Sequence, residues 1–291
     1  MNTKTIFSAV LFTAILFAFS SCDRDERVTG VTLNRSTLEL TVGSSETLIA
    51  SVQPAGAANR AVTWTSSDSN IASVNNGQVT ANAPGTATIT VTTADGGKTA
   101  DAVVTVVYDR YNDVGVVING IRWATRNVDA PGTFADNPQD AGMFYQWNRN
   151  IGWSSTDPMT DSNGGTTWDS SMPVGTEWGS ANDPCPEGWR VPTQTEITNL
   201  QNQPNIWTAN WNNTGVSGRL FGTAPNQIFL PVTGFRDHNN GALNYAGTFG
   251  GYWSGTQHVS VNAHTLSFSS TFVTVAWDRR TYGFSVRCVA E

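Results

Sequence analysis

Short stretches of alternating apolar and polar residues, separated by turns, dominate residues 28–107 and constrain their fold strongly. The turns are marked by Asn76-Gly77, Pro84-Gly85 and Gly96-Gly97, dipeptides typical of tight connections between strands. Alternation of this kind over about 80 residues favours a small β-sandwich. The apolar positions that carry the pattern are Val31, Leu33, Leu38, Leu40, Val42, Val62, Trp64, Ile71, Val74, Val79, Ile89, Val91, Val104 and Val106.

Tryptophan is distributed unevenly along the chain. Of the 11 Trp residues, only Trp64 precedes residue 120, and the other ten lie between Trp123 and Trp277. A change of this kind indicates two cores built on different plans. Charged residues make up only 13% of the chain while Gly, Ser, Thr and Asn are abundant, so we expect a mainly β protein.

The stretch VTWTSSDSNIASVNNGQVTANAPGTATITVT in the first part carries three features of a known family. They are a W-x-S-S-D strand end, a V-x-x-G-x-V hairpin and a G-T-A-x-I-T-V strand. The stretch resembles the bacterial Ig-like group 2 (BIG2) domain, and the resemblance covers residues 28–107. It implies an Ig-like spacer or adhesion module. We expect no catalysis here, because this part contains no His and its carboxylates are scattered.

The segment CPEGWRVPTQTEITNLQNQ in the second part predicts a short helix. Pro192 favours an extended entry, and Thr193 with Glu196 three residues later forms a capping-box pattern. Ile197 and Leu200 then provide one apolar face.

The rest of the second part, which we place at residues 114–291 after a polar hinge at 108–113, is irregular and rich in loops. Near its end, five short β-type segments are expected at residues 229–237, 250–257, 263–269, 271–277 and 282–289.

Six sequence blocks across the second part resemble one family in order: WATRNVDAPG, DAGMFYQWNR, CPEGWRVPT, LPVTGFRD, GGYWSGTQ and GFSVRCV. They are similar to the major-paralogous (FISUMP) domain of bacterial surface lipoproteins, a branch of the C-type lectin-like folds. The resemblance implies an α+β, loop-rich domain in which an early helix packs with the last strands. It also implies a disulfide between the first and last ordered segments. The predicted fold is thus an Ig-like β-sandwich followed by a C-type lectin-like domain.

The N-terminus has the layout of a secretory signal. Lys4 precedes an apolar run at residues 6–19, which is too short for a retained membrane span. Phe19-Ser20-Ser21-Cys22 resembles a lipobox, so we expect residues 1–22 to be a lipoprotein signal with Cys22 as the lipidated residue. Residues 23–27 would be the tether of a surface-exposed outer-membrane lipoprotein. The alternative is a plain signal peptide with Cys22 discarded or unpaired.

Only two further cysteines are present, Cys185 and Cys288. In an exported chain thiols oxidise, and two cysteines allow one connectivity, so we predict a Cys185–Cys288 disulfide. Phe284, Val286 and Cys288 would share the inner face of a terminal strand. The alternative is a pair of buried free thiols.

Charge and motif content exclude or disfavour several functions. The formal net charge is −7 and no run of Lys or Arg occurs, so the chain is not expected to bind nucleic acid. His238, His258 and His264 lack metal-binding spacing, no thiol is spare for copper, and no nucleophile-elbow motif occurs. Paired carboxylates for glycoside hydrolysis are not singled out. We expect a non-enzymatic protein without a cofactor.

One weak calcium candidate lies in DPMTDSNGGTTWD, whose oxygen-rich, glycine-containing composition suits a hard cation. The segment departs from the EF-hand register, and the sugar-binding signatures of calcium-dependent lectins are missing from the sequence. A polar surface loop is the alternative. The candidate ligands are Asp157, Asp161, Asn163 and Asp169.

The last 50 or so residues supply the candidate binding surface. Leu266 and Phe268 would share a face with His264, and Val273 and Val275 would face the core. The side chains expected to be free for an extracellular protein or glycan are Gln257, His258, Ser260, Asn262, His264, Thr265, Ser267, Ser269, Thr274, Trp277, Asp278, Arg279 and Tyr282. For Trp277 and Tyr282 the alternative is partly buried packing.

The same region, from the Tyr-Trp-Ser segment to the Gly-Phe-x-x-Arg tail, is similar to variable proteins of diversity-generating retroelements. That similarity implies a fixed fold with rewritten solvent-facing residues, although Trp277 would have to be part of the fixed scaffold.

The sequence as a whole predicts a lipid-anchored surface protein that displays a binding domain on an Ig-like stalk. The alternatives are a structural subunit of a surface assembly and an enzyme of the cell envelope.

Overall fold

The computed structural model describes residues 26–291, which form two compact units. The first unit consists mainly of residues up to 104 and the second mainly of residues from 105 onward, with the short segments 39–44 and 81–85 grouped with the second. The predicted signal and lipidation site at Cys22 lie outside the described residues. No helix within residues 26–291 is both long and apolar enough to cross a membrane.

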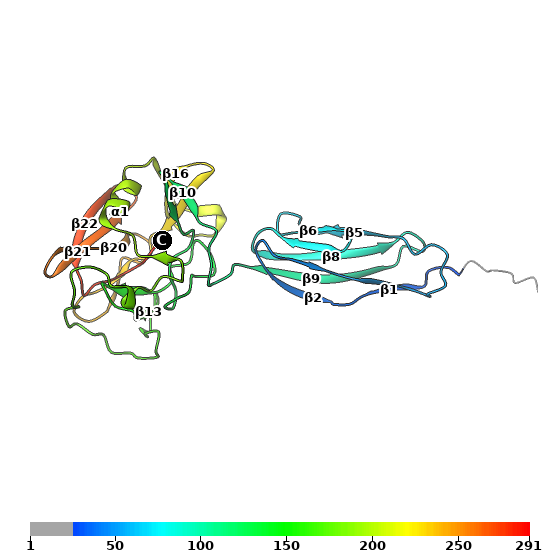
Figure 1. Cartoon of the computed structure of the whole chain (residues 1–291), viewed down its shortest axis with the longest axis horizontal. Helices are drawn as coiled ribbons and strands as arrows, with labels where there is room; N and C mark the ends of the chain where they lie inside the picture. Colours follow the sequence, from blue (N-terminus) through cyan, green and yellow to red (C-terminus); the bar gives the residue numbers. More distant parts are fainter. Residues whose placement is uncertain (1–25) are drawn as a thin grey trace, which may run out of the picture. The chain divides into compact units, whose positions relative to one another are not determined.

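The first unit is built of short antiparallel strands, as the alternation predicts (Figure 1). Its core contains Val31, Val52 and Val91, each buried on the inward side of its strand. The sheets are β1 (Gly30–Leu33) with β4 (Ala50–Gln53); β2 (Thr37–Thr41), β9 (Thr99–Val107), β8 (Gly85–Thr93) and β5 (Val62–Ser66); and β3 (Ser45–Thr47), β7 (Gln78–Ala81) and β6 (Ala72–Asn75).

The predicted Asn76-Gly77 turn joins β6 to β7. Both residues have positive φ, 49° and 84°, as a two-residue hairpin turn of this type requires. A Cβ at Gly77 would lie 2.5 Å from the carbonyl oxygen of Leu48, so no other residue fits this turn without displacing the backbone.

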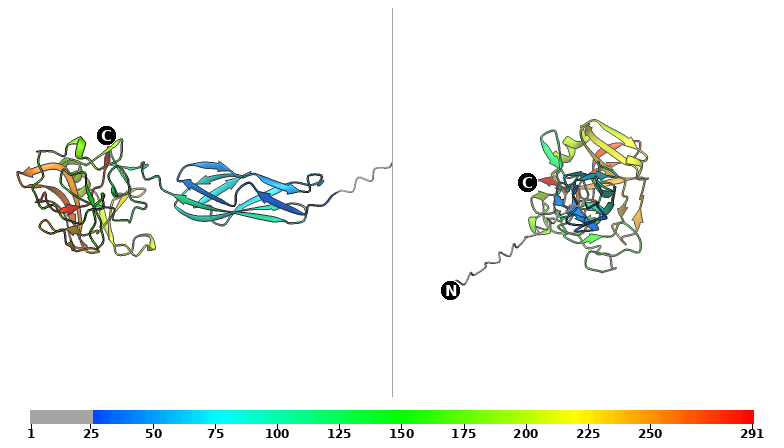
Figure 2. Two further views of the ribbon diagram at one scale, coloured as in Figure 1. Left: turned by 90° about the horizontal axis from the view of Figure 1, so that it is seen from below. Right: turned by 90° about the vertical axis from the view of Figure 1, so that its right-hand side faces the viewer.

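The second unit contains many short strands joined by long loops (Figures 1 and 2). One four-stranded sheet has the strand order β10 (Val116–Ile118), β11 (Ile121–Trp123), β24 (Val289–Ala290), β14 (Trp189–Arg190). A five-stranded sheet has the order β13 (Gly152–Trp153), β12 (Phe144–Gln146), β23 (Gly283–Phe284), β18 (Phe235–Arg236), β19 (Leu243–Asn244). Two three-stranded sheets complete the unit. One consists of β15 (Asn205–Thr208), β16 (Gly218–Thr223) and β17 (Asn226–Pro231), and the other of β20 (Gly250–Val259), β21 (Asn262–Phe268) and β22 (Val273–Arg279). Two short 3-10 turns occur at η1 (Ser180–Asn182) and η2 (Trp211–Asn213).

The predicted helix is α1 (Gln194–Gln201), which lies beside β20, β21 and β22 (Figure 1). Thr193 and Glu196 form the expected capping box, and Glu196 also receives two hydrogen bonds from the Arg190 guanidinium at 2.9 and 2.7 Å. Ile197 and Leu200 are buried against the last sheet. The helix prediction is therefore confirmed.

The Cys185–Cys288 disulfide is also confirmed, with 6.1 Å between its Cα atoms. The prediction of a single terminal strand is wrong. Residues 283–290 form two strands of two residues each, β23 and β24, which enter different sheets. Because this segment joins two sheets, both of its sides are covered, and Arg287 is as deeply buried as Val286 and Cys288.

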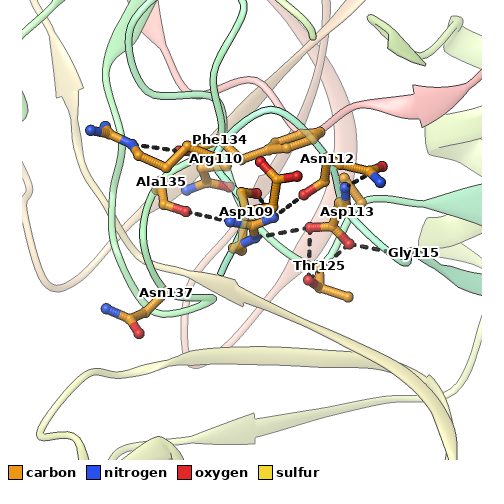
Figure 3. A network of polar contacts seen from close by, with 12 residues as sticks. Asp109, Arg110, Asn112, Asp113, Gly115, Thr125, Phe134, Ala135 and Asn137 are labelled. Carbon is orange, nitrogen blue, oxygen red and sulfur yellow. Dashed lines mark hydrogen bonds and ion pairs between the residues drawn. The ribbon is translucent and has the colours of Figure 1, made fainter. Parts of the chain in front are cut away.

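The segment 108–113, expected to be a polar hinge, is held within the second unit by the buried Arg126 side chain. Its guanidinium pairs with the Asp113 carboxylate at 3.1 Å and donates hydrogen bonds to the carbonyl oxygens of Asp109, Asn112 and Ala135. Figure 3 shows Asp113 also accepting hydrogen bonds from Thr125 and from the backbone of Gly115. These contacts fix the entry into the second unit.

Candidate functional site

The antiparallel sheet β20–β21–β22 carries most of the predicted binding residues, and the register of β21 with β22 assigns those in these two strands to one of two faces. On one face His264 lies opposite Trp277, and Leu266 lies opposite Val275. We call this the helix face, because α1 covers its central part. On the other face, Thr265 lies opposite Ala276. We call this the hydroxyl face, and its further members are Ala263, Ser267, Thr274 and Asp278.

Leu266 and Phe268 are buried on the helix face, and Val273 and Val275 pack against the same core, as predicted. The exposure expected for Thr265 and Ser267 is wrong, since their side chains are only 0% and 4% exposed.

The reason is a second layer over part of the hydroxyl face. Gly251 pairs with Ser267, and a Cβ at Gly251 would lie 2.4 Å from the Phe284 ring. Trp253, which pairs with Thr265, also contacts Phe284, with ring centroids 4.9 Å apart. Strand alternation separates two faces but does not reveal that both are covered.

Asp278 is held at the edge of this covered region. Its Oδ2 accepts a hydrogen bond from the Thr265 hydroxyl at 2.9 Å, and Thr265 lies 3.2 Å from the Ser267 hydroxyl. Burial raises the pKa of Asp278, and the Thr265 hydrogen bond only partly opposes that effect. A partly buried carboxylate therefore terminates a row of hydroxyl groups.

Asp278→Asn is expected to increase stability near neutral pH. The pKa of Asp278 lies above its ordinary value of 3.8 in the folded protein, so the folded state holds this proton more tightly than the unfolded state. The contribution of Asp278 to stability consequently falls as pH rises from the ordinary pKa of an aspartate through the raised pKa of Asp278, and it stays lower at neutral pH. Urea denaturation between about pH 4 and pH 7 should show that the free energy of unfolding of the wild type, minus that of the variant, falls as pH rises. Asp101→Asn, in β9, is the control substitution. If the free energy of unfolding of Asp278→Asn depends on pH in the same way as that of the wild type, the expectation is contradicted.

A chain of partly exposed rings adjoins this carboxylate. We call it the aromatic surface and define it as Phe235, His238, Tyr245, Phe249, Phe272 and Tyr282. Phe235 is its centre, with ring centroids 5.7 Å from Tyr245, 5.7 Å from Phe249 and 5.4 Å from Tyr282. The surface extends from Tyr282 to His238 at 4.7 Å and from Phe249 to Phe272 at 6.5 Å.

Tyr245 is the most exposed member, at 68%, and Phe272 is 43% exposed. Tyr245 also has a φ of 55°, a backbone conformation that is unfavourable for a bulky residue. Its carbonyl oxygen accepts hydrogen bonds from the backbone N–H groups of Thr248 and Phe249, which hold the turn. A large exposed ring on strained backbone is a feature associated with binding sites.

The charges around Tyr282 are predominantly negative. Burial raises the pKa of the Tyr282 hydroxyl, the carboxylates of Asp237 and Asp278 raise it further, and Arg279 lowers it. Arg279 pairs with Asn262 and therefore belongs to the helix face. The aromatic surface thus lies within the field of two carboxylates.

A second group of predicted residues meets at the free end of the helix face. His258 stacks on Trp277 with centroids 5.3 Å apart, and His264 lies 4.8 Å from His258. Trp277 is 55% exposed, so its ring combines packing against His258 with a free surface. Burial lowers the pKa of His264, His258 lowers it further, and a hydrogen bond with the backbone of Ala276 opposes both. We call these three residues the histidine–tryptophan cluster.

The predicted binding residues are thus divided rather than gathered. Asn262 and Arg279 lie on the same face as the histidine–tryptophan cluster, Gln257 lies opposite Ala263, and Ser260 lies in the β20–β21 turn. Thr274 and Asp278 lie on the hydroxyl face, and Tyr282 follows β22. Ser269 lies in the β21–β22 turn, where its hydroxyl contacts that of Thr271. Tyr282 is partly buried and packs against the core, so the packing alternative describes it in part.

Five members of the aromatic surface were not predicted: Phe235, His238, Tyr245, Phe249 and Phe272. The available signal was the density of rings within residues 235–249, together with the Asn240-Gly241 turn. Their proximity to the last strands arises from the pairing of β18 with β23, which local pattern does not reveal.

The calcium candidates are engaged in other contacts. Asp157 pairs with the buried Arg236 at 2.7 Å, and Oδ1 of Asp161 accepts the backbone N–H groups of Asn163 and Gly165. For Asp169, burial raises the pKa, but Arg149 and Ser171 outweigh this effect and lower it to about 2. Within the described part of the chain, no group of three or more His, Cys, Asp or Glu side chains is arranged to hold a metal ion.

Comparison with known families confirms the first domain. Residues 27–104 match the bacterial Ig-like domain (group 2), so the BIG2 prediction is correct. Residues 191–289 match a family described as a domain of unknown function, DUF8237.

The chain is 51% identical over 81 residues to an "Ig-like virion protein" of Serratia phage KSP90, covering 27% of this chain and 31% of the relative. It is 44% identical over 68 residues to a "Minor capsid protein" of Enterobacteria phage T3, covering 23% and 16%. The chain therefore spans less than a third of the length of these relatives. Domains 5–6 of the S-layer protein SbsC are similar at 12% identity with a TM-score of 0.24, covering 87% of this chain and 96% of that one.

Proposed function

We propose that the chain is a cell-surface lipoprotein that displays a ligand-binding C-terminal domain on an Ig-like stalk. The Ig-like domain supports display, because its relatives include proteins named as virion and capsid components. The signal-like N-terminus and its Cys22 support export and lipid anchoring in the outer membrane. The disulfide supports an oxidising, extracytoplasmic location.

The proposal includes a C-type lectin-like fold of the FISUMP type for the second unit. In support, α1 packs on the last sheet, and the disulfide joins the segment before the helix to the terminal segment. Diversification by a retroelement is also part of the proposal, with Thr274, Asp278 and Tyr282 as the positions beside the hydroxyl face. The burial of Thr265 and Ser267 removes two positions from that set.

The aromatic surface is the observation that carries the proposed function. A contiguous set of rings that includes two exposed ones, Tyr245 and Phe272, marks an interaction site more often than a folding requirement. Aromatic residues also contribute most of the energy at many interfaces. We propose recognition of an extracellular ligand without catalysis and without a cofactor.

The test is binding of the purified chain to a panel of bacterial and host polysaccharides and extracellular proteins. The double variant Tyr245→Ser/Phe272→Ser should bind its ligand at least about tenfold more weakly, because the two most exposed rings of the aromatic surface are removed. Ile206→Ser, an exposed apolar position in β15, is the matched control and should bind normally.

Three results separate the alternatives. A ligand whose affinity is the same for the wild type and the double variant would contradict the proposed site. Concentration-dependent self-association that the double variant abolishes would favour a structural subunit of a surface assembly. Turnover of a panel member by the wild type would favour an enzyme of the cell envelope.

A further inference from the structure

We propose that the aromatic surface binds a basic segment of an extracellular protein, with lysine or arginine side chains lying against its rings and their charges directed at Asp237 and Asp278. This inference rests on the proposed function and names the partner chemistry of the same surface. It is carried by the unbalanced charge beside the rings.

Neither carboxylate has an arginine or lysine partner among the described residues, whereas several other acidic residues of the second unit do. Within residues 26–291, Asp113, Asp129, Asp157 and Asp169 each form an ion pair with an arginine. Neither Asp237 nor Asp278 has an arginine or lysine within ion-pair distance in the same range of residues; the nearest basic group to Asp237 is Nδ1 of His238, at 3.5 Å.

Their internal hydrogen bonds leave acceptor capacity unused. Asp237 Oδ1 accepts the backbone N–H of Asn239 at 2.9 Å, and Asp278 Oδ2 accepts the Thr265 hydroxyl. An ionised carboxylate accepts about four hydrogen bonds. A guanidinium or ammonium group would supply both the missing donors and the missing charge.

The rings are arranged to receive the same groups. Tyr245 stacks on Phe235 and His238 stacks on Tyr282, so one face of each outer ring is turned away from its partner. The face of an aromatic ring attracts a cation, and arginine stacks on it in particular. A basic side chain could therefore place its apolar stem on a ring while its head reaches a carboxylate.

A neutral glycan would use the rings but would gain little from the carboxylate charges. Of the charges that act on Tyr282, two are the carboxylates of Asp237 and Asp278, and one is the Arg279 guanidinium. This excess of negative charge favours a cationic protein segment.

The experiment measures binding of the purified chain to a peptide of alternating glycine and arginine by isothermal titration calorimetry. The matched probes are a peptide of alternating glycine and glutamate and the neutral polysaccharide dextran. The central variant is Asp237→Asn/Asp278→Asn, which removes both charges while an amide oxygen can still accept from Asn239 and Thr265. Near-ultraviolet circular dichroism checks that each variant is folded.

We expect the arginine peptide to bind the wild type and the glutamate peptide not to bind. The Asn double variant should lose about tenfold in affinity, and raising the salt from about 50 to about 500 mM should weaken wild-type binding more than variant binding. Tyr245→Ser/Phe272→Ser should also bind weakly, and Ile206→Ser should bind normally.

Equal affinity of the arginine peptide for the wild type and both double variants would show non-specific attraction and overturn the inference. If dextran or the glutamate peptide binds and requires Tyr245 while the arginine peptide does not bind, the inference fails but the proposed function stands. If the arginine peptide does not bind and no member of the wider panel depends on Tyr245, both fail.

Discussion

The double variant Cys185→Ala/Cys288→Ala is expected to be less stable than the wild type by about 4–5 kcal/mol. The disulfide joins residues 103 positions apart, and closing a loop of about 100 residues in the unfolded chain is worth this much in the chain-entropy model. Urea unfolding followed by tryptophan fluorescence reports mainly on the second unit, because ten of the 11 Trp residues lie there.

A reductant supplies the control for this prediction. Reduction should destabilise the wild type by a similar amount and should leave the alanine double variant unchanged. A loss below about 1 kcal/mol in the double variant would show that the unfolded chain gains little freedom from the missing cross-link.

Arg126→Met is expected to cost about 3–5 kcal/mol, because it leaves the Asp113 carboxylate buried without a counter-charge. Both side chains of this pair are only 1% exposed. The substitution also removes hydrogen bonds to the carbonyl oxygens of Asp109 and Ala135 (Figure 3). The entry segment 108–113 should then open, which limited proteolysis would detect as new cleavage near Tyr111.

Arg122→Met tests the same substitution at an exposed position, where the guanidinium donates to the Val114 carbonyl oxygen at 3.3 Å. It should change the free energy of unfolding by less than about 0.5 kcal/mol. Adding Asp113→Leu to Arg126→Met should restore part of the lost stability, since no unpaired charge remains. If Arg126→Met costs no more than Arg122→Met, the buried pair is not the structural anchor inferred from its geometry.

Local pattern predicted those parts of the fold whose cause is local. The hairpin turn at Asn76-Gly77 follows from the positive φ that these two residues tolerate. The helix start follows from Thr193 and Glu196, which satisfy each other's backbone donors. The disulfide followed from the small number of cysteines rather than from geometry.

The remaining features depend on long-range pairing. Residues 283–290 read as one strand because their apolar positions alternate, but β23 and β24 pair with different sheets, and Arg287 is buried between them. Its guanidinium donates to the Asn127 side chain and to the Ala124 carbonyl oxygen, partners about 160 residues away.

The candidate site was also only partly predictable from local sequence pattern. His264 and Trp277 could be placed on one face by alternation, and the register confirms that they are opposite each other. The burial of Thr265 and the aromatic surface around Phe235 depend on which loops cover the sheet, and this requires the tertiary structure.

The most direct test of the account is hydrogen exchange of the full chain with and without the glycine–arginine peptide. Because the aromatic surface is proposed as the binding face, protection should increase at backbone amides of residues 245–251 and 272–282. The Ig-like domain and the β20–β21 turn beside Ser260 should be unaffected. Protection that is confined to the histidine–tryptophan cluster, spread evenly over the chain, or missing throughout would contradict the claim that the aromatic surface is the site of recognition.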